Sequence, residues 1–128
     1  MDVLLVDDDP LMQQLISRFL GEFGYRVGLA GLASDAVTIA RQSPPALFMI
    51  DMHLPDLDGP DALAALRKLP GCSATPAIAI SGLSEEELRH MPINDFNEYL
   101  VKPIELDTLY AAVARHVGPQ FARTVGAG

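Results

Sequence analysis

Acidic side chains at two places in the sequence have the types and spacing needed to bind a divalent cation. Three aspartates follow one another at Asp7–Asp9, and Asp51 begins a second stretch with three further aspartates. Two carboxylates about 4 Å apart repel by about 4 kcal/mol at an effective dielectric near 20, so a cluster must take up protons or hold a cation. Oxygen ligands without histidine or cysteine favour Mg²⁺. Asp7, Asp8 and Asp51 are therefore candidate magnesium ligands, provided that the fold brings them together.

Two other side chains could complete a site for phosphoryl transfer. Ser81 and Lys102 each come directly after a short apolar run, as Asp51 does. A lysine ammonium and a metal ion offset the charge of a phosphoryl group, while a hydroxyl donates a hydrogen bond to it. A carboxylate can then act as the attacking or leaving oxygen. Asp51 is the best candidate nucleophile, because it closes the central predicted strand.

These residues can meet only if the elements that carry them form one sheet. Five short apolar runs alternate with five segments that have apolar residues at helical spacing. Three of the runs are almost continuously apolar, which is typical of parallel strands covered on both faces. The predicted strands are Val3–Val6, Tyr25–Ala30, Ala46–Ile50, Ala77–Ile80 and Tyr99–Val101.

Capping and turn residues delimit the predicted helices. Asp9 suits the N-cap of the first helix and Gly24 its end. A capping box at Ser84–Glu87 starts the fourth helix, which Pro92 must keep short. The remaining acids of the second stretch are predicted to face solvent and to cap the helix that follows them: Asp56, Asp58 and Asp61.

Strand–helix alternation repeated five times predicts an α/β fold with a doubly wound parallel sheet and right-handed crossovers. In such a sheet the ligand site lies outside the carboxyl ends of the strands, where the winding reverses. We therefore expect one crevice to hold all five polar residues that follow strands. They are Asp7 and Asp8 after the first strand, Asp51 after the third, Ser81 after the fourth and Lys102 after the fifth.

Composition excludes several classes of protein. The chain has 128 residues, of which 49% are hydrophobic and 20% charged, as in a single globular domain; we assign residues 1–118 to this domain and 119–128 to a tail. A net charge of −8 with only two lysines argues against direct nucleic-acid binding. A single cysteine, Cys72, excludes a disulfide-stapled fold. Neither a signal peptide nor a membrane-spanning segment is readable, so we expect a cytoplasmic location.

Four segments of the chain resemble, in order and at the same spacing, the motifs of the receiver domains of two-component response regulators. The resemblance covers roughly residues 2–117. It implies the (βα)5 flavodoxin-like receiver fold, with strand order 2-1-3-4-5. The four segments are Leu4–Pro10, Ile50–Gly59, Ile80–Gly82 and Tyr99–Pro103.

The resemblance also implies a function. Receiver domains are phosphoacceptor switches, not enzymes with a diffusible substrate, although they assist their own phosphorylation and dephosphorylation. With Mg²⁺ the domain would take a phosphoryl group onto Asp51 from a phosphohistidine of a histidine kinase or histidine-phosphotransfer domain. The resemblance implies that Asp7, Asp8 and Asp51 hold the ion together with the backbone carbonyl of His53.

Further roles follow from the same resemblance. Lys102 matches the lysine that contacts the phosphoryl group. Ser81 matches the switch hydroxyl, and Tyr99 matches the aromatic side chain that turns inward when that hydroxyl moves. Gly82 stands where alanine is typical, and Leu83 borders the path of the hydrolytic water, where it would slow loss of the phosphoryl group.

Other interpretations remain open at this point. A phosphatase of the haloacid dehalogenase type would use Asp7 as nucleophile and Asp9 as acid, but Leu11 stands where its motif expects a hydroxyl. A degenerate receiver would act only as a protein-binding module. The domain could be a free regulator or part of a hybrid histidine kinase. Finally, the apolar stripe of the first helix either docks a partner or is wholly buried; it consists of Leu11, Met12, Leu15 and Ile16.

Overall fold

Strands and helices alternate along the chain in the computed structural model, which describes residues 1–82, 85–90 and 95–119. These residues form five strands and five helices, as the sequence predicts. In chain order they are β1 (Val3–Val6), α1 (Pro10–Glu22), β2 (Val27–Ala30), α2 (Ala33–Gln42), β3 (Leu47–Asp51), α3 (Gly59–Arg67), β4 (Ala77–Ser81), α4 (Glu85–Arg89), β5 (Glu98–Val101) and α5 (Leu106–Val117).

The strands form one parallel sheet in the order β2-β1-β3-β4-β5. The doubly wound parallel sheet and its strand order are therefore confirmed. The order reverses beside β1, because β2 lies on one side of it and β3 on the other. In the register of these three strands, Val6 lies opposite both Ala30 and Ile50, so their carboxyl ends are level. This is the place where a doubly wound sheet leaves a crevice for a ligand.

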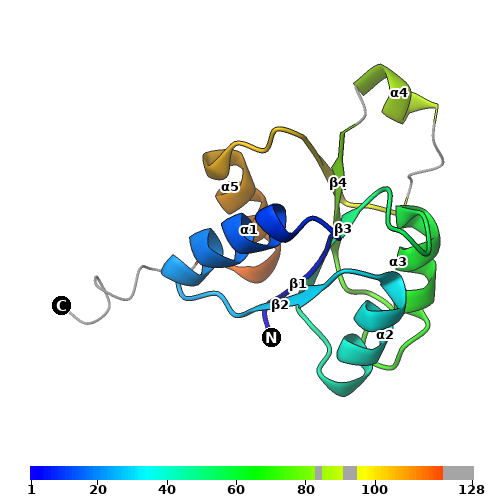
Figure 1. The fold of residues 1–128 in the computed structure, drawn as a ribbon. Helices are drawn as coiled ribbons and strands as arrows, with labels where there is room; N and C mark the ends of the chain where they lie inside the picture. The colour runs from blue at the N-terminus through cyan, green and yellow to red at the C-terminus, as the bar shows by residue number, and fades with distance from the viewer. Residues whose placement is uncertain (83–84, 91–94, 120–128) are drawn as a thin grey trace.

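Two helical layers cover the sheet (Figure 1). Helices α1 and α5 lie on one face, and α2 and α3 lie on the other. Every residue of β3 is buried, and its side chains alternate between the two layers. Phe48 and Ile50 join the core beneath α2 and α3, whereas Leu47 and Met49 join the core beneath α1 and α5. Burial on both faces explains why the central strands have almost no polar residues.

The largest difference from the predicted strand boundaries is at the start of the second strand. The predicted second strand starts too early: β2 begins at Val27, and the buried Tyr25 instead donates a hydrogen bond from its hydroxyl to the carbonyl of Gly118, at 2.7 Å.

The predicted cap of α1 is confirmed, since Asp9 Oδ1 accepts from the backbone N–H of Leu11 at 2.9 Å. Three sequence predictions concern residues that lie outside the described ranges: Ser84 as a cap, Pro92 as a helix breaker and Leu83 at the water path.

Gly59, the first residue of α3, lies against the backbone that follows β3. A Cβ atom on it would lie 2.9 Å from the Cα atom of Met52 and 3.2 Å from the backbone oxygen of Asp51. Because backbone atoms must move to relieve such contacts, we expect Gly59→Ala to lower the free energy of unfolding by about 1–3 kcal/mol. Urea denaturation measures the change. Gly21→Ala is the control, since a Cβ there meets nothing within 4 Å; equal stability of the two variants would contradict the close contact.

No described helix combines the length and the apolar character that a membrane crossing requires.

Candidate functional site

Acidic residues from the two stretches meet at the carboxyl ends of β1 and β3. Because Val6 pairs with Ile50, the residues that follow them, Asp7 and Asp51, lie at the same level of the sheet. One carboxylate oxygen from each of Asp7, Asp8 and Asp51 lies within 4.8 Å of the others. Asp7 is fully buried, Asp51 is 7% exposed and Asp8 is exposed. The predicted cluster of three carboxylates is thus present, with one member open to solvent.

Lys102 lies beside the two buried carboxylates. Its ammonium group donates a hydrogen bond to Asp51 Oδ2 at 3.4 Å and lies 3.7 Å from Asp7 Oδ2. Burial by itself would lower the pKa of Lys102, but the negative charges of Asp7 and Asp51 outweigh it and raise the pKa above its ordinary value. Lys102 is therefore held in its charged form at neutral pH.

The two buried carboxylates have different surroundings. Asp7 Oδ1 accepts a hydrogen bond from the backbone N–H of Asp9 at 2.9 Å, but Asp7 Oδ2 is buried without a hydrogen bond. Asp51 Oδ1 accepts from the backbone N–H of His53 at 3.1 Å. Burial raises the pKa of Asp7, and the charge of Asp51 raises it further. The cluster therefore resists carrying its full negative charge unless a cation is present.

These residues fit a magnesium ion. The donors are hard carboxylate oxygens, and one of them, Asp7 Oδ2, has no hydrogen bond although it is buried. A buried oxygen in this state is costly unless something supplies a positive charge or a donor. Lys102 meets only part of that need, since its ammonium is 3.7 Å away. The role of the His53 carbonyl stays a prediction.

Of the two predicted switch residues, Ser81 lies at the carboxyl end of β4, and Tyr99 is the second residue of β5. Ser81 is the last residue of β4 and is fully buried. Its backbone carbonyl accepts from the N–H of Lys102 at 2.7 Å, which ties the two strand ends together. Tyr99 lies on β5 with 37% of its surface exposed, and its ring centroid is 6.4 Å from that of Phe96. Partial burial raises the pKa of the Tyr99 hydroxyl.

Two contacts near the site were not predicted from the sequence. Gln13 on α1 donates from Nε2 to the backbone oxygen of Asp7 at 2.6 Å, and so fastens the end of β1 to the helix. Asp56 was predicted to face solvent and to cap the following helix; it is exposed, as predicted, but it caps a different helix. Its carboxylate instead accepts hydrogen bonds from the backbone N–H groups of Ala33 and Ser34, at 2.9 and 3.0 Å. Asp56 therefore caps the start of α2, the helix before it in the chain. No local sequence signal could reveal partners so far away along the chain.

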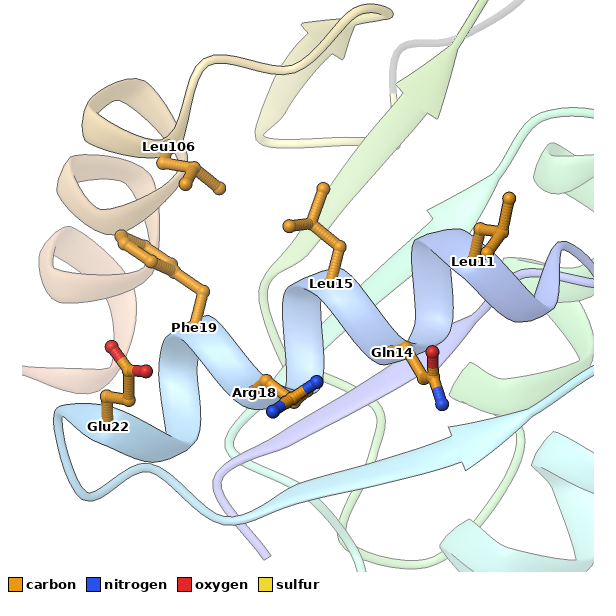
Figure 2. A pocket seen from close by; sticks show the side chains of 7 residues that line it. All are labelled: Leu11, Gln14, Leu15, Arg18, Phe19, Glu22 and Leu106. Carbon is orange, nitrogen blue, oxygen red and sulfur yellow. The ribbon is translucent and has the colours of Figure 1, made fainter.

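The apolar stripe of α1 is divided between core and surface. Ile16 is 1% exposed, whereas Leu11 is 76% and Leu15 is 48% exposed. The alternative that the whole stripe is buried is therefore wrong. Figure 2 shows Leu15 and Phe19 of α1 and Leu106 of α5 around the groove between the two helices. The exposed part of the stripe begins close to the carboxylate cluster, because α1 starts at Pro10.

Comparison with known families and proteins identifies one matching family and several relatives. Residues 3–114 match the model of the response regulator receiver domain. The "Uncharacterized 14.6 kDa protein in sodA1 3'region" of Leptolyngbya boryana is 35% identical over 106 residues, which are 82% of this chain and 81% of that protein. The signal transduction histidine-protein kinase BarA of Escherichia coli K12 is 33% identical over 120 residues, 91% of this chain but only 13% of BarA.

A solved structure supports the same relationship. The receiver domain of the sensor histidine kinase PA1611 from Pseudomonas aeruginosa PAO1 superimposes with a TM-score of 0.83 at 30% identity, over 91% of this chain and 97% of that domain. That crystal structure has a magnesium ion coordinated in its active site cleft.

Proposed function

The chain belongs to the response regulator receiver domain family, and we propose that it takes a phosphoryl group from a phosphohistidine onto Asp51 in a two-component phosphorelay. The observation that carries the proposal is the arrangement of charge around Asp51. Asp7 and Asp8 lie within 4.8 Å of it as a cation site, and the Lys102 ammonium lies 3.4 Å from its Oδ2. Asp51 is also the last residue of β3, at the edge of the sheet where a doubly wound fold has its ligand crevice.

The proposed transfer forms one bond and breaks one. A carboxylate oxygen of Asp51 attacks the phosphorus, the P–N bond to the donor imidazole breaks, and its electron pair stays on the imidazole nitrogen. Asp51 then carries an acyl phosphate, and the donor is an ordinary histidine. Lys102 offsets the negative charge of the phosphoryl oxygens. Mg²⁺, held by Asp7, Asp8 and Asp51 with the carbonyl of His53, would neutralise further charge on the same oxygens.

We propose that phosphorylation is read out at Ser81 and Tyr99. A phosphoryl group on Asp51 offers oxygen acceptors to the Ser81 hydroxyl, and movement of that hydroxyl would free space for the Tyr99 ring to turn inward. Support comes from the location of the two residues. Ser81 closes the strand next to β3, and Tyr99 is partly exposed on the strand beyond. The output of the domain would be a change in its protein-binding surface in the cytoplasm, without direct contact to nucleic acid.

The test of the proposal is covalent modification by a small phosphodonor. We expect acetyl phosphate to add one phosphoryl group with Mg²⁺ present and none with excess EDTA, as measured by intact-protein mass. We expect no turnover of a phosphomonoester such as p-nitrophenyl phosphate, which a haloacid dehalogenase-type phosphatase would hydrolyse. That alternative is also disfavoured by Leu11, which stands where its motif expects a hydroxyl. A degenerate receiver would show neither reaction.

The exposed apolar part of α1 is the surface that we propose for docking the phosphohistidine donor. Leu15→Glu is expected to slow phosphotransfer from a histidine kinase or histidine-phosphotransfer domain at least about tenfold, because loss of one buried apolar anchor costs about 1.4 kcal/mol or more. Labelling by acetyl phosphate should not change, since Leu15 is 48% exposed and does not support the core. Paired phosphotransfer and acetyl phosphate assays measure both. Equal losses with both donors would contradict a docking role.

A further inference from the structure

The loop that follows β3 is fastened at its base by its own backbone. The N–H of Gly59 donates to the carbonyl of Met52 at 2.9 Å, and the N–H of Leu54 donates to the carbonyl of Leu57 at 3.2 Å. Between these bonds, His53 and Asp58 form an antiparallel bridge. The result is a narrow turn that projects from the carboxyl end of β3, with Pro55 and Asp56 near its tip.

Asp56 ties the tip of this turn to a different layer of the fold. Its Oδ1 accepts from the N–H of Ala33 at 2.9 Å and its Oδ2 from the N–H of Ser34 at 3.0 Å. These are the first two residues of α2, whose N–H groups have no partner inside the helix. The N-cap residue Leu32 supplies no side-chain hydrogen bond, so Asp56 takes the place of a cap. The two bonds lower the pKa of Asp56 and keep its carboxylate charged.

Helix α2 is a firm anchor for such a tie. Its inward face consists of alanines that are almost completely buried: Ala33, Ala36 and Ala40. Small side chains let the helix pack close to the sheet, and they have no alternative rotamers. A loop tied to the start of α2 is therefore held in place relative to the sheet.

We propose that Asp56 is a positioning residue for the phosphoacceptor site, acting through the loop that it anchors. The backbone N–H of His53, in that loop, donates to Asp51 Oδ1, which leaves Oδ2 facing Lys102. The same loop carries the His53 carbonyl that is predicted to bind the metal. Both carboxylate oxygens of Asp56 bind backbone N–H groups of α2, so its role would be to limit the orientations that the loop can adopt and not to bind the metal or the phosphoryl group. The inference rests on the proposed function, because it concerns the same site.

Mg²⁺ affinity of the intact domain tests this role. Loss of a group that positions a metal ligand typically weakens metal affinity by about 10–100-fold, so we expect Asp56→Ala to weaken Mg²⁺ binding by about tenfold. Asp56→Asn retains one acceptor oxygen and should lose less. Asp61→Ala removes the same charge from the same acidic stretch, within the first turn of α3, and should bind as the wild type does. Calorimetric titration well below the melting temperature of each variant measures all four affinities.

Amide hydrogen exchange gives a readout that does not depend on metal. The N–H groups of Ala33 and Ser34 should exchange faster in Asp56→Ala and at the wild-type rate in Asp61→Ala. Unchanged exchange in Asp56→Ala would overturn the anchor itself. Equal Mg²⁺ affinities of Asp56→Ala and Asp56→Asn, or of Asp56→Ala and Asp61→Ala, would overturn the positioning role, since charge alone would then explain the effect. A wild-type protein that binds no Mg²⁺ would overturn the proposed metal site, and this inference with it.

Discussion

Asp51→Asn is expected to abolish covalent labelling by acetyl phosphate, reducing it to the level seen without Mg²⁺. An amide has no anionic oxygen to attack phosphorus, so the acyl phosphate cannot form. The fold should survive, because asparagine has nearly the same shape and can still accept the hydrogen bond that His53 donates at 3.1 Å. Removing one charge from a crowded acidic cluster also relieves repulsion with Asp7. Intact-protein mass and circular dichroism measure labelling and fold on the same sample.

A matched control distinguishes loss of the nucleophile from loss of one negative charge near the site. Asp61→Asn removes one charge from the first turn of α3 and should be labelled as fast as the wild type. Labelling that persists in Asp51→Asn, and that peptide mapping places on Asp7 or Asp8, would assign the nucleophile to β1 and contradict the proposal. Such an outcome would favour the phosphatase-like arrangement.

The fold was predictable because its signals are local and repeat. Each central strand is an unbroken apolar run such as Val3–Val6, and each run ends at a polar residue that the sheet cannot bury cheaply. Parallel strands align their carboxyl ends, so these polar residues had to meet. Asp7 and Asp51 are level in the sheet for that reason, as the pairing of Val6 with Ile50 shows. Three of the predicted site residues, Asp7, Asp8 and Asp51, do form one cluster.

Features that the sequence did not reveal depend on contacts between distant residues. Asp56 is exposed, as predicted, but the helix that it caps is not the one that follows it: its hydrogen-bond partners are 22 and 23 residues earlier in the chain. Tyr25 was predicted to begin a strand, but its hydroxyl donates a hydrogen bond to a carbonyl 93 residues away. The stripe of α1 had the right period, but periodicity does not say how much of a stripe the neighbouring α5 covers. In each case the tertiary partner determines the outcome, and no local pattern encodes it.

Asp7→Asn is expected to stabilise the metal-free domain at neutral pH. Burial raises the pKa of Asp7 above its ordinary value, so the folded protein holds the Asp7 proton more tightly than the unfolded chain does. The contribution of Asp7 to stability is therefore fully present below the ordinary carboxyl pKa of about 3.9, and it is lost as the pH rises through the raised folded value. Asparagine carries no charge at any pH and avoids this loss. Thermal melts in EDTA should show the variant above the wild type at pH 7, with the difference shrinking toward pH 4.

With Mg²⁺ present, we expect the wild type to melt at a higher temperature than Asp7→Asn. A ligand that binds only the folded state adds about 2.7 kcal/mol of stability at 100 times its dissociation constant. The wild type gains this because Asp7 Oδ2, buried without a hydrogen bond, can bind the ion. Asp7→Asn loses an anionic ligand and should gain much less. Asp8→Asn is the informative control: Asp8 is exposed, so its replacement relieves little desolvation and should remove the response to Mg²⁺ without comparable stabilisation in EDTA. A wild-type melting temperature that does not change with millimolar Mg²⁺ would contradict the proposed metal site. An Asp7→Asn variant that is less stable than the wild type in EDTA at pH 7 would contradict the claim that the charged Asp7 carboxylate destabilises the metal-free domain.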